Sequence, residues 1–184
     1  MLEDKNKYIN VPNFLTLLRF LMIGVMIWFF LNGHPIYAMI VFIVAVLTDF
    51  LDGYIARRFN QVTTFGKFLD PIADKVLVLT AMLYLMITMT NRVPIWAVVI
   101  VILREFIVTT IRLMAVEKGR VIAASIYGKI KTALTMVALV VLLFHDFGIT
   151  PWIGDILFYL AILMTLVSGI DYFIKNRNII FESM

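Results

Sequence analysis

Long apolar stretches separated by short polar connections dominate this chain. Six stretches approach the roughly 20 mostly apolar residues that a helix needs to cross the hydrocarbon core of a bilayer. Connections such as NGHP, TNRVP and HDFGITP contain the glycine, proline and asparagine residues that break helices. The pattern therefore predicts six transmembrane helices, with the other two turns at residues 57–67 and 117–122. The predicted helices cover residues 14–32, 37–56, 68–89, 95–116, 124–144 and 152–174.

The composition indicates that these apolar helices belong to an all-α integral membrane protein. Hydrophobic residues make up 62% of the chain and charged residues 15%, against about 45–50% and about 25% in soluble domains. The 184 residues leave too little chain for a membrane bundle and a separate soluble module, so residues 1–184 are expected to form one domain. Its short N-terminal segment, 1–13, lacks the features of a secretory signal peptide, so the first span is expected to be retained. Cysteine is absent, which excludes disulfides and cysteine metal sites.

Basic residues are distributed unevenly between the two sets of connecting loops. If the spans are numbered from a cytoplasmic N-terminus, only Arg92 falls on the outer set. Lysine and arginine accumulate on the cytoplasmic side of membranes, so we expect both termini in the cytoplasm. The net charge of +4 then reflects topology and attraction to anionic lipid. No basic segment interleaved with aromatic residues suggests a nucleic-acid partner.

Four aspartates interrupt the apolar pattern where the second and third predicted helices approach the cytoplasm. Asp49 and Asp52 are three residues apart, and Asp70 and Asp74 are four apart. These spacings place each pair on one face of its helix. The helical rise puts both pairs at a similar depth near the cytoplasmic interface. The four carboxylates are therefore expected to meet in one plane.

Carboxylates that meet beside lipid require a compensating positive charge. Oxygen ligands favour hard ions such as Mg²⁺, Mn²⁺ or Ca²⁺, and the lack of cysteine or nearby histidine argues against zinc and copper. An all-carboxylate site of this size suits a two-metal centre that acts on phosphate esters. A structural ion pair would explain one aspartate beside one arginine, but it does not explain four carboxylates on two stripes.

Small residues and one arginine extend the acidic stripes. Gly53 and Gly66 leave room for a ligand to approach the backbone closely. Ala56 keeps the same face open one turn after Asp52. Arg57 follows at the membrane surface, where its guanidinium can bind a phosphate in a fork geometry.

These residues resemble the signature of the CDP-alcohol phosphotransferase family, D-x2-D-G-x2-A-R-x8-G-x3-D-x3-D. The resemblance implies a membrane enzyme with six transmembrane helices that transfers a phosphatidyl or related group from a CDP-linked donor to an alcohol and releases CMP. All eight fixed positions match with the correct gaps: Asp49, Asp52, Gly53, Ala56, Arg57, Gly66, Asp70 and Asp74.

The same resemblance implies roles for individual residues. Asp49, Asp52 and Asp70 would bind two Mg²⁺ or Mn²⁺ ions. Asp74 would be a partial metal ligand and the general base that deprotonates the acceptor hydroxyl. Because family members commonly form homodimers, a homodimer is expected. The implied CDP-binding residues are Asp49, Asp52, Gly53, Ala56, Arg57 and Gly66.

Basic residues in the C-terminal half predict a site for a phosphorylated acceptor. Arg112, Lys129 and Lys131 lie near the inner ends of the fourth and fifth predicted helices, where they would form a cationic pocket. Membrane anchoring by snorkelling is the alternative for these three. Arg104 completes the predicted acceptor site, although a structural ion pair explains it equally well. The candidate partners for that pair are Glu105 and Asp171.

Three further segments narrow the resemblance within the family. They are R-E-F-x-V-T-x-x-R, G-K-x-K-T and, at residues 10–19, N-x-P-N-x-x-T-x-x-R. They resemble members that use CDP-diacylglycerol as donor and sn-glycerol 3-phosphate as acceptor. The third segment places Asn13, Thr16 and Arg19 near the cytoplasmic site, although Asn13 could equally cap a helix.

Two alternatives stay open on the sequence. The first is another acceptor, such as inositol phosphate, serine or phosphatidylglycerol, because charge alone does not separate phosphorylated acceptors. The second is a cation transporter, because intramembrane carboxylates also line ion paths. The carboxylates cluster at one depth and the outer half of the bundle has almost no polar residue, which counts against a transporter.

Overall fold

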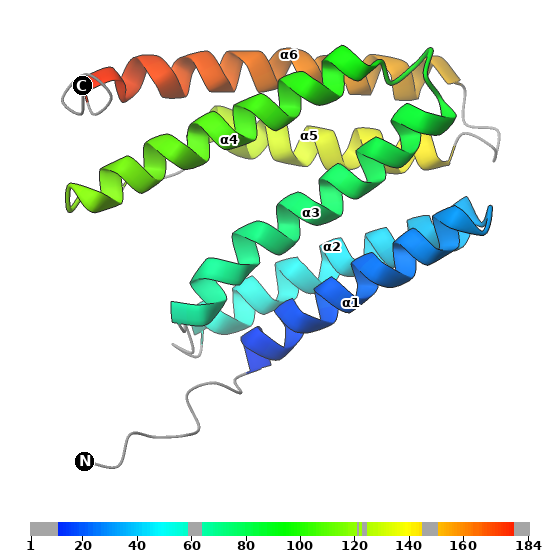
Figure 1. Ribbon diagram of the computed structural model, residues 1–184, viewed down its shortest axis with the longest axis horizontal. Helices are drawn as coiled ribbons and strands as arrows, with labels where there is room; N and C mark the ends of the chain where they lie inside the picture. Colours follow the sequence, from blue (N-terminus) through cyan, green and yellow to red (C-terminus); the bar gives the residue numbers. More distant parts are fainter. Residues whose placement is uncertain (1–10, 59–63, 121, 123–124, 145–150, 179–184) are drawn as a thin grey trace. The chain divides into compact units, whose positions relative to one another are not determined.

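In the residues that it describes, the computed structural model contains six α-helices (Figure 1). It describes residues 11–58, 64–120, 122, 125–144 and 151–178, and within these ranges it leaves undescribed the side chains of 11–13, 50–58, 64–68, 70, 71 and 151. No strand occurs in the described ranges. The helices are α1 (Val11–Leu31), α2 (Pro35–Arg58), α3 (Thr64–Thr88), α4 (Ile95–Glu117), α5 (Ile126–Leu143) and α6 (Pro151–Lys175).

The number and order of the predicted helices are confirmed, and most boundaries agree within three residues. The largest difference is in the predicted turn at residues 57–67. There α2 continues to Arg58 and α3 already begins at Thr64. Arginine and lysine are good helix formers, so the charges that mark the end of an apolar stretch do not end the helix. The signature residues of this stretch consequently lie on helices.

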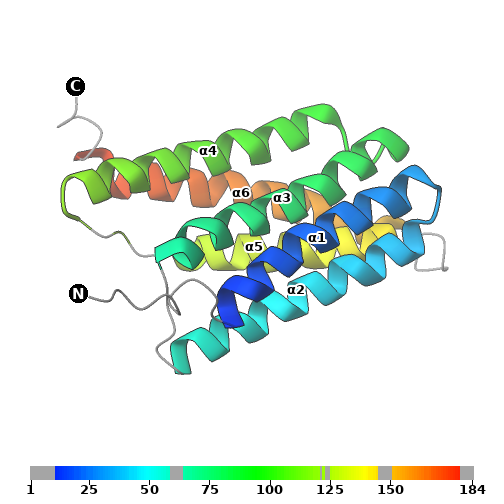
Figure 2. The same ribbon diagram turned by 60° about the horizontal axis from the view of Figure 1, so that its bottom comes forward.

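The chain divides into two compact units, and the N-terminal one contains residues Met1–Tyr84. In this unit α1 and α2 form an antiparallel pair that lies side by side in Figures 1 and 2. Gly33 makes the tight turn between them with a φ of 72°, a left-handed conformation that suits glycine. His34 N–H donates to the carbonyl of Phe29 at 2.9 Å, which closes the end of α1.

Apolar contacts hold this unit together and attach α3 to the helix pair. Met26 of α1 and Phe42 of α2 are completely buried. The rings of Phe30 and Tyr84 stack with their centroids 3.8 Å apart, which joins α1 to α3. This packing joins α1 to α2 and α3, the two helices that carry the four aspartates.

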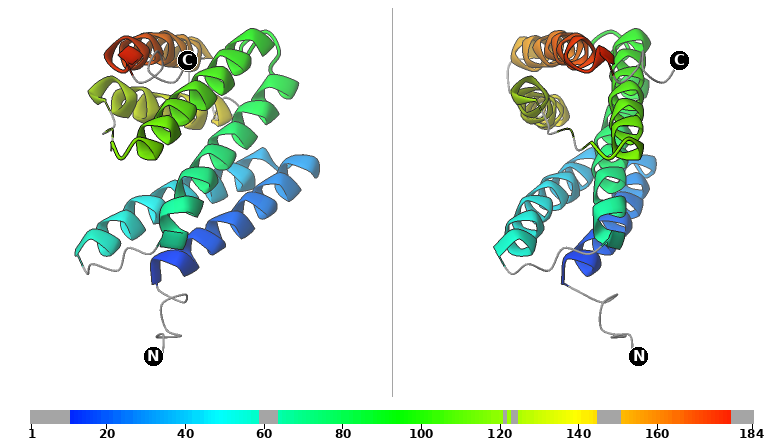
Figure 3. Two further views of the ribbon diagram at one scale, coloured as in Figure 1. Left: turned by 60° about the vertical axis from the view of Figure 1, so that its left-hand side comes forward. Right: turned by 90° about the vertical axis from the view of Figure 1, so that its left-hand side faces the viewer.

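The C-terminal unit, Leu85–Met184, is built on α5 and α6. Figure 3 shows these two helices side by side, and α4 packs along α6. Gly154 permits close packing of the pair, because a Cβ at this position would lie 2.9 Å from Cδ2 of Leu142. Ser125 caps α5 by accepting a hydrogen bond from Gly128 N–H at 3.1 Å.

Three of the described helices are long and apolar enough to cross a membrane. Their apolar segments are Phe14–Leu31, Ile126–Leu143 and Trp152–Lys175. Large apolar side chains such as Leu21, Phe106 and Ile170 are exposed, which suits contact with lipid. That α2, α3 and α4 also span the membrane, and that residues 1–184 form one domain, stay predictions.

Candidate functional site

Arg19 joins one aspartate from each acidic stripe. Its Nη2 lies 2.8 Å from Oδ1 of Asp49, and its Nη1 lies 3.0 Å from Oδ1 of Asp74. The three residues come from α1, α2 and α3, and Arg19 and Asp74 are 55 positions apart in the sequence. The fold therefore brings two of the four predicted aspartates to one guanidinium.

The three charged side chains differ in their exposure. The Arg19 side chain is 0% exposed, whereas those of Asp49 and Asp74 are 32% and 39% exposed. Thr16, one turn before Arg19 on α1, is also buried. The cluster thus has a cation on its buried side and carboxylates that remain accessible. An acidic site that binds a metal ion needs carboxylates whose charge is partly compensated. It also needs carboxylate oxygens that the ion can reach.

The other signature residues have helical backbones, but their side chains lie outside the described residues. They belong to the last turns of α2 and the first turns of α3, consistent with the expected stripes. Asn13 is the third residue of α1, which begins at Val11, so the suggestion that Asn13 caps this helix is wrong. The signature residues concerned are Asp52, Gly53, Ala56, Arg57, Gly66 and Asp70.

The ligand atoms in the described part of the acidic cluster are of the kind that divalent ions bind. Asp49 and Asp74 supply only carboxylate oxygens, the ligands preferred by Mg²⁺ and Mn²⁺. Their common contact with Arg19 shows that the two helices hold them close enough to share one positive charge. Among the side chains that the structure describes, no third carboxylate or histidine joins them in a metal-binding group. The side chains of the predicted ligands Asp52 and Asp70 lie outside the described residues.

A second charged cluster centres on Glu105 in the C-terminal unit. Oε1 of Glu105 lies 2.9 Å from Nη1 of Arg104 and 2.7 Å from Nζ of Lys131. The three side chains are 19%, 12% and 6% exposed, respectively. One carboxylate from α4 thus holds two nearly buried cations, one on its own helix and one on α5.

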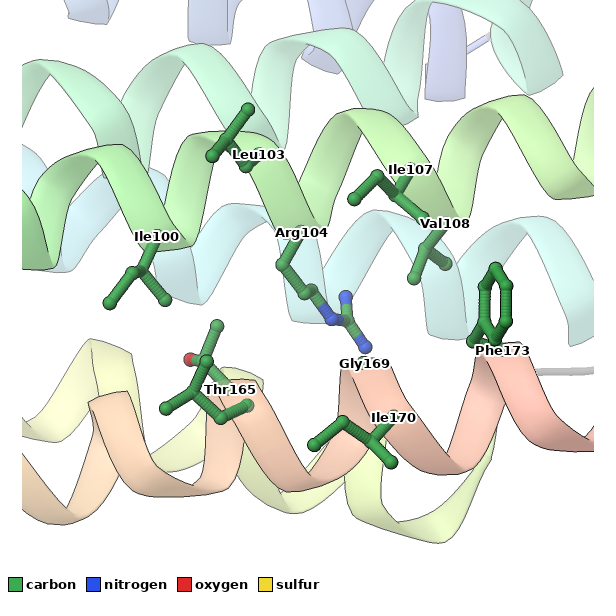
Figure 4. Close-up of a pocket in the computed structure, with 10 residues that line it drawn as sticks. Ile100, Leu103, Arg104, Ile107, Val108, Thr165, Gly169, Ile170 and Phe173 are labelled. Atoms are coloured by element: carbon green, nitrogen blue, oxygen red, sulfur yellow. The ribbon is translucent and has the colours of Figure 1, made fainter.

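Two glycines make room for Arg104. A Cβ on Gly169 of α6 would lie 3.2 Å from Cγ of Arg104, and a Cβ on Gly128 of α5 would lie 3.4 Å from its Nη2. Figure 4 shows the guanidinium of Arg104 directed toward Gly169 from α4. It lies at a mostly apolar cavity of about 330 Å³, whose lining includes Ile100, Val108 and Phe173.

The remaining predicted acceptor residues have different surroundings. Nε of Arg112 donates a hydrogen bond to the Tyr172 hydroxyl at 3.2 Å, and its Cζ lies 5.6 Å from the centroid of that ring. Lys129 is exposed. The structure therefore brings Arg104 and Lys131 together through a shared carboxylate, while Arg112 is held separately by α6.

Asp171 was a candidate partner for Arg104, but it pairs with another residue. Its Oδ1 lies 2.8 Å from Nζ of Lys175, one turn later on α6. Lys175 also lies 5.8 Å from the centroid of the Tyr127 ring. Of the two candidates in the sequence, Glu105 is thus the one that contacts Arg104.

Sequence reasoning missed the roles of Tyr172, Gly128 and Gly169. In the sequence, Tyr172 is typical of an aromatic membrane anchor. In the structure, its hydroxyl accepts a hydrogen bond from Arg112. Glycine within an apolar helix is a signal of close approach, and it could have marked the two glycines. Nothing in the sequence shows that the group that approaches them is Arg104.

Comparisons with known proteins match nearly the whole chain. The model of the family described as CDP-alcohol phosphatidyltransferase matches residues 9–167. A Bacillus subtilis protein is 45% identical over 140 residues, which cover 74% of this chain and 72% of that protein. An Escherichia coli K12 protein is 39% identical over 177 residues, which cover 91% of this chain and 95% of that protein. Both carry the name CDP-diacylglycerol--glycerol-3-phosphate 3-phosphatidyltransferase.

Proposed function

Because this chain belongs to the CDP-alcohol phosphatidyltransferase family, we propose that it transfers the phosphatidyl group of CDP-diacylglycerol to sn-glycerol 3-phosphate. The products are phosphatidylglycerophosphate and CMP, so the activity is a step of phospholipid biosynthesis. The observation that carries the proposal is the convergence of signature residues Asp49 and Asp74 on Arg19. The names of relatives at 39–45% identity support the choice of donor and acceptor.

The N-terminal unit is proposed to take the CDP end of the donor. Asp49, Asp52 and Asp70 would hold two divalent ions, Mg²⁺ or Mn²⁺, with Asp74 as a partial ligand. When bound, such ions neutralise a diphosphate and lower the pKa of a nearby hydroxyl. The residues proposed to lie along the CDP portion are Gly53, Ala56, Arg57 and Gly66.

Asp74 is proposed to accept the proton of the attacking hydroxyl. The acceptor oxygen forms a bond to the β-phosphorus, the one joined to diacylglycerol. The bond from that phosphorus to the bridging oxygen of the diphosphate breaks, and CMP leaves with the electron pair. Asp74 is 39% exposed, so its carboxylate is accessible to a hydroxyl that approaches from outside the cluster.

The C-terminal unit is proposed to bind the phosphate of the acceptor. Arg104, Arg112, Lys129 and Lys131 supply four cations, and forked guanidinium groups suit phosphate oxygens. Glu105 already occupies Arg104 and Lys131, so it sets how much of their charge a phosphate experiences. Arg112 and Lys129 carry more of the phosphate binding in consequence.

The proposed setting is the cell membrane, with six spans, cytoplasmic termini and a site that faces the cytoplasm. Three membrane-competent helices support the membrane location. The uneven distribution of basic residues supports the orientation. A homodimer is proposed on the family resemblance alone.

The release of CMP by purified protein in detergent tests the proposed function. The assay contains CDP-diacylglycerol and Mg²⁺ and compares glycerol 3-phosphate, inositol phosphate, serine and phosphatidylglycerol as acceptors. Release with glycerol 3-phosphate alone supports the proposal. Release with another acceptor keeps the donor reaction and overturns the choice of acceptor. If none of the four supports CMP release, transfer from CDP-diacylglycerol is rejected, and another donor or a cation transporter becomes the better interpretation.

A further inference from the structure

We propose that Arg19 is a positioning residue, which orients Asp49 and Asp74 for a divalent ion from the buried side of the acidic cluster. The proposal rests on the proposed function, because it requires a metal ion at these aspartates. It assigns a role to a residue that the sequence places only near the cytoplasmic site.

The two contacts of Arg19 determine how Asp49 and Asp74 lie relative to one another. Arg19 uses a different terminal nitrogen for each carboxylate, Nη2 for Asp49 and Nη1 for Asp74. A guanidinium is planar and rigid, so the directions of its two N–H groups are fixed relative to one another. The contacts therefore fix the position of one carboxylate of α2 relative to one of α3. A flexible ammonium group would fix only the charge between them.

Arg19 is buried, whereas both carboxylates that it contacts are partly exposed. A fully buried guanidinium is costly unless it is paired, and the two carboxylates offset that cost. Asp49 and Asp74 keep 32% and 39% of their side-chain surface exposed. Arg19 thus contacts them from the interior, and a metal ion can approach from the accessible side. The same carboxylates can serve both cations at once.

This arrangement predicts the sign of the effect on metal affinity. Groups that orient the ligands of a metal typically contribute about 10–100-fold to its affinity. If Arg19 were only a counter-cation that competes with the metal, its removal would strengthen metal binding, because a positive charge would be lost. The positioning role and the competing role therefore predict opposite changes.

Mn²⁺ binding to the purified full-length protein in detergent tests the proposal. Free Mn²⁺ is measured by electron paramagnetic resonance, without substrates. Arg19→Gln is expected to weaken Mn²⁺ binding about 10–100-fold. Arg19→Lys retains the charge without the fork, so it is expected to weaken binding by a smaller factor.

Arg92→Gln is the matched control. Arg92 is also paired with an aspartate, because its Nε lies 3.8 Å from Oδ1 of Asp155. Arg92 and Asp155 belong to the C-terminal unit. This substitution removes the same charge from a pair outside the acidic cluster, and Mn²⁺ affinity is expected to stay at the wild-type value.

The outcomes separate the positioning role from the proposed function. Unchanged or tighter Mn²⁺ binding in both Arg19 variants, with normal binding by the wild type, would overturn the positioning role and leave the metal centre standing. If Arg19→Gln does not fold, Arg19→Lys decides, and unchanged binding in that variant overturns the proposal. If the wild type binds no Mn²⁺, both the metal centre and the role of Arg19 are rejected, whatever the variants do.

Discussion

Nζ of Lys131 lies 2.7 Å from Oε1 of Glu105. This nearly buried ion pair links α5 to α4. The same oxygen also accepts from Arg104. Breaking a buried ion pair by removing one partner leaves an uncompensated charge, which is strongly destabilising. The charge state of Glu105 is therefore central to the stability of the C-terminal unit.

Glu105→Gln is expected to lower the free energy of unfolding by about 3 kcal/mol, because two cations lose their shared counter-charge. The exposed Glu117 at the end of α4 provides the control. Glu117→Gln is expected to change stability by no more than about 0.5 kcal/mol. Thermal unfolding in detergent measures both. Equal effects of the two substitutions would show that the Glu105 cluster contributes nothing specific.

Gly169→Ala is expected to displace the side chain of Arg104, because the added Cβ would lie 3.2 Å from its Cγ. If Arg104 contributes to the acceptor site, the KM for glycerol 3-phosphate rises several-fold. Gly24→Ala is the matched control, since a Cβ there meets no atom within 4 Å. The Gly24 substitution is expected to stabilise the helix by up to about 1 kcal/mol, because alanine has the higher helix propensity and its Cβ meets no atom. An unchanged KM in the Gly169 variant would remove Arg104 from the proposed acceptor site.

Arg112→Gln is expected to raise the KM for glycerol 3-phosphate by about tenfold or more, because it removes a charge-assisted phosphate contact. Tyr172→Phe removes only the hydroxyl that accepts from Arg112 Nε. It is expected to raise the same KM by a smaller factor, since the cation and the aromatic ring remain. Steady-state kinetics with varied glycerol 3-phosphate compares them. A KM that neither substitution moves argues that Arg112 is a membrane anchor.

Asp74→Asn is expected to lower kcat by about 10²–10⁴-fold, the usual contribution of a general base. Asp171→Asn is a control, because Asp171 pairs with Lys175 within α6. It is expected to keep wild-type kcat. A wild-type turnover rate in the Asp74 variant would assign the proton transfer to another group.

The sequence predicted the helices well because their signals are local. Apolar length identifies each helix, and spacings of three and four residues place Asp49 with Asp52 and Asp70 with Asp74 on helix faces. The turn predicted at residues 57–67 was too long, because α2 includes Arg58 and α3 already begins at Thr64. Charged residues with good helix propensity do not by themselves end a helix.

Contacts between distant segments were not predictable in the same way. The sequence placed Arg19 near the site, but its pairing with Asp74 spans 55 positions and depends on how α1 and α3 pack. Similarly, no local pattern decides whether Arg104 pairs with Glu105 or with Asp171. That choice depends on which carboxylate the packed helices bring within reach.

The most direct test of the account is the transfer of label from radioactive glycerol 3-phosphate into lipid by the purified protein. The reaction contains CDP-diacylglycerol and Mg²⁺, and a parallel reaction contains a chelator. The account predicts labelled phosphatidylglycerophosphate in the organic phase for the wild type, and almost none for Asp74→Asn or with the chelator. Label transfer at the wild-type rate in the presence of the chelator, or in the Asp74 variant, would contradict metal-assisted transfer at the aspartates.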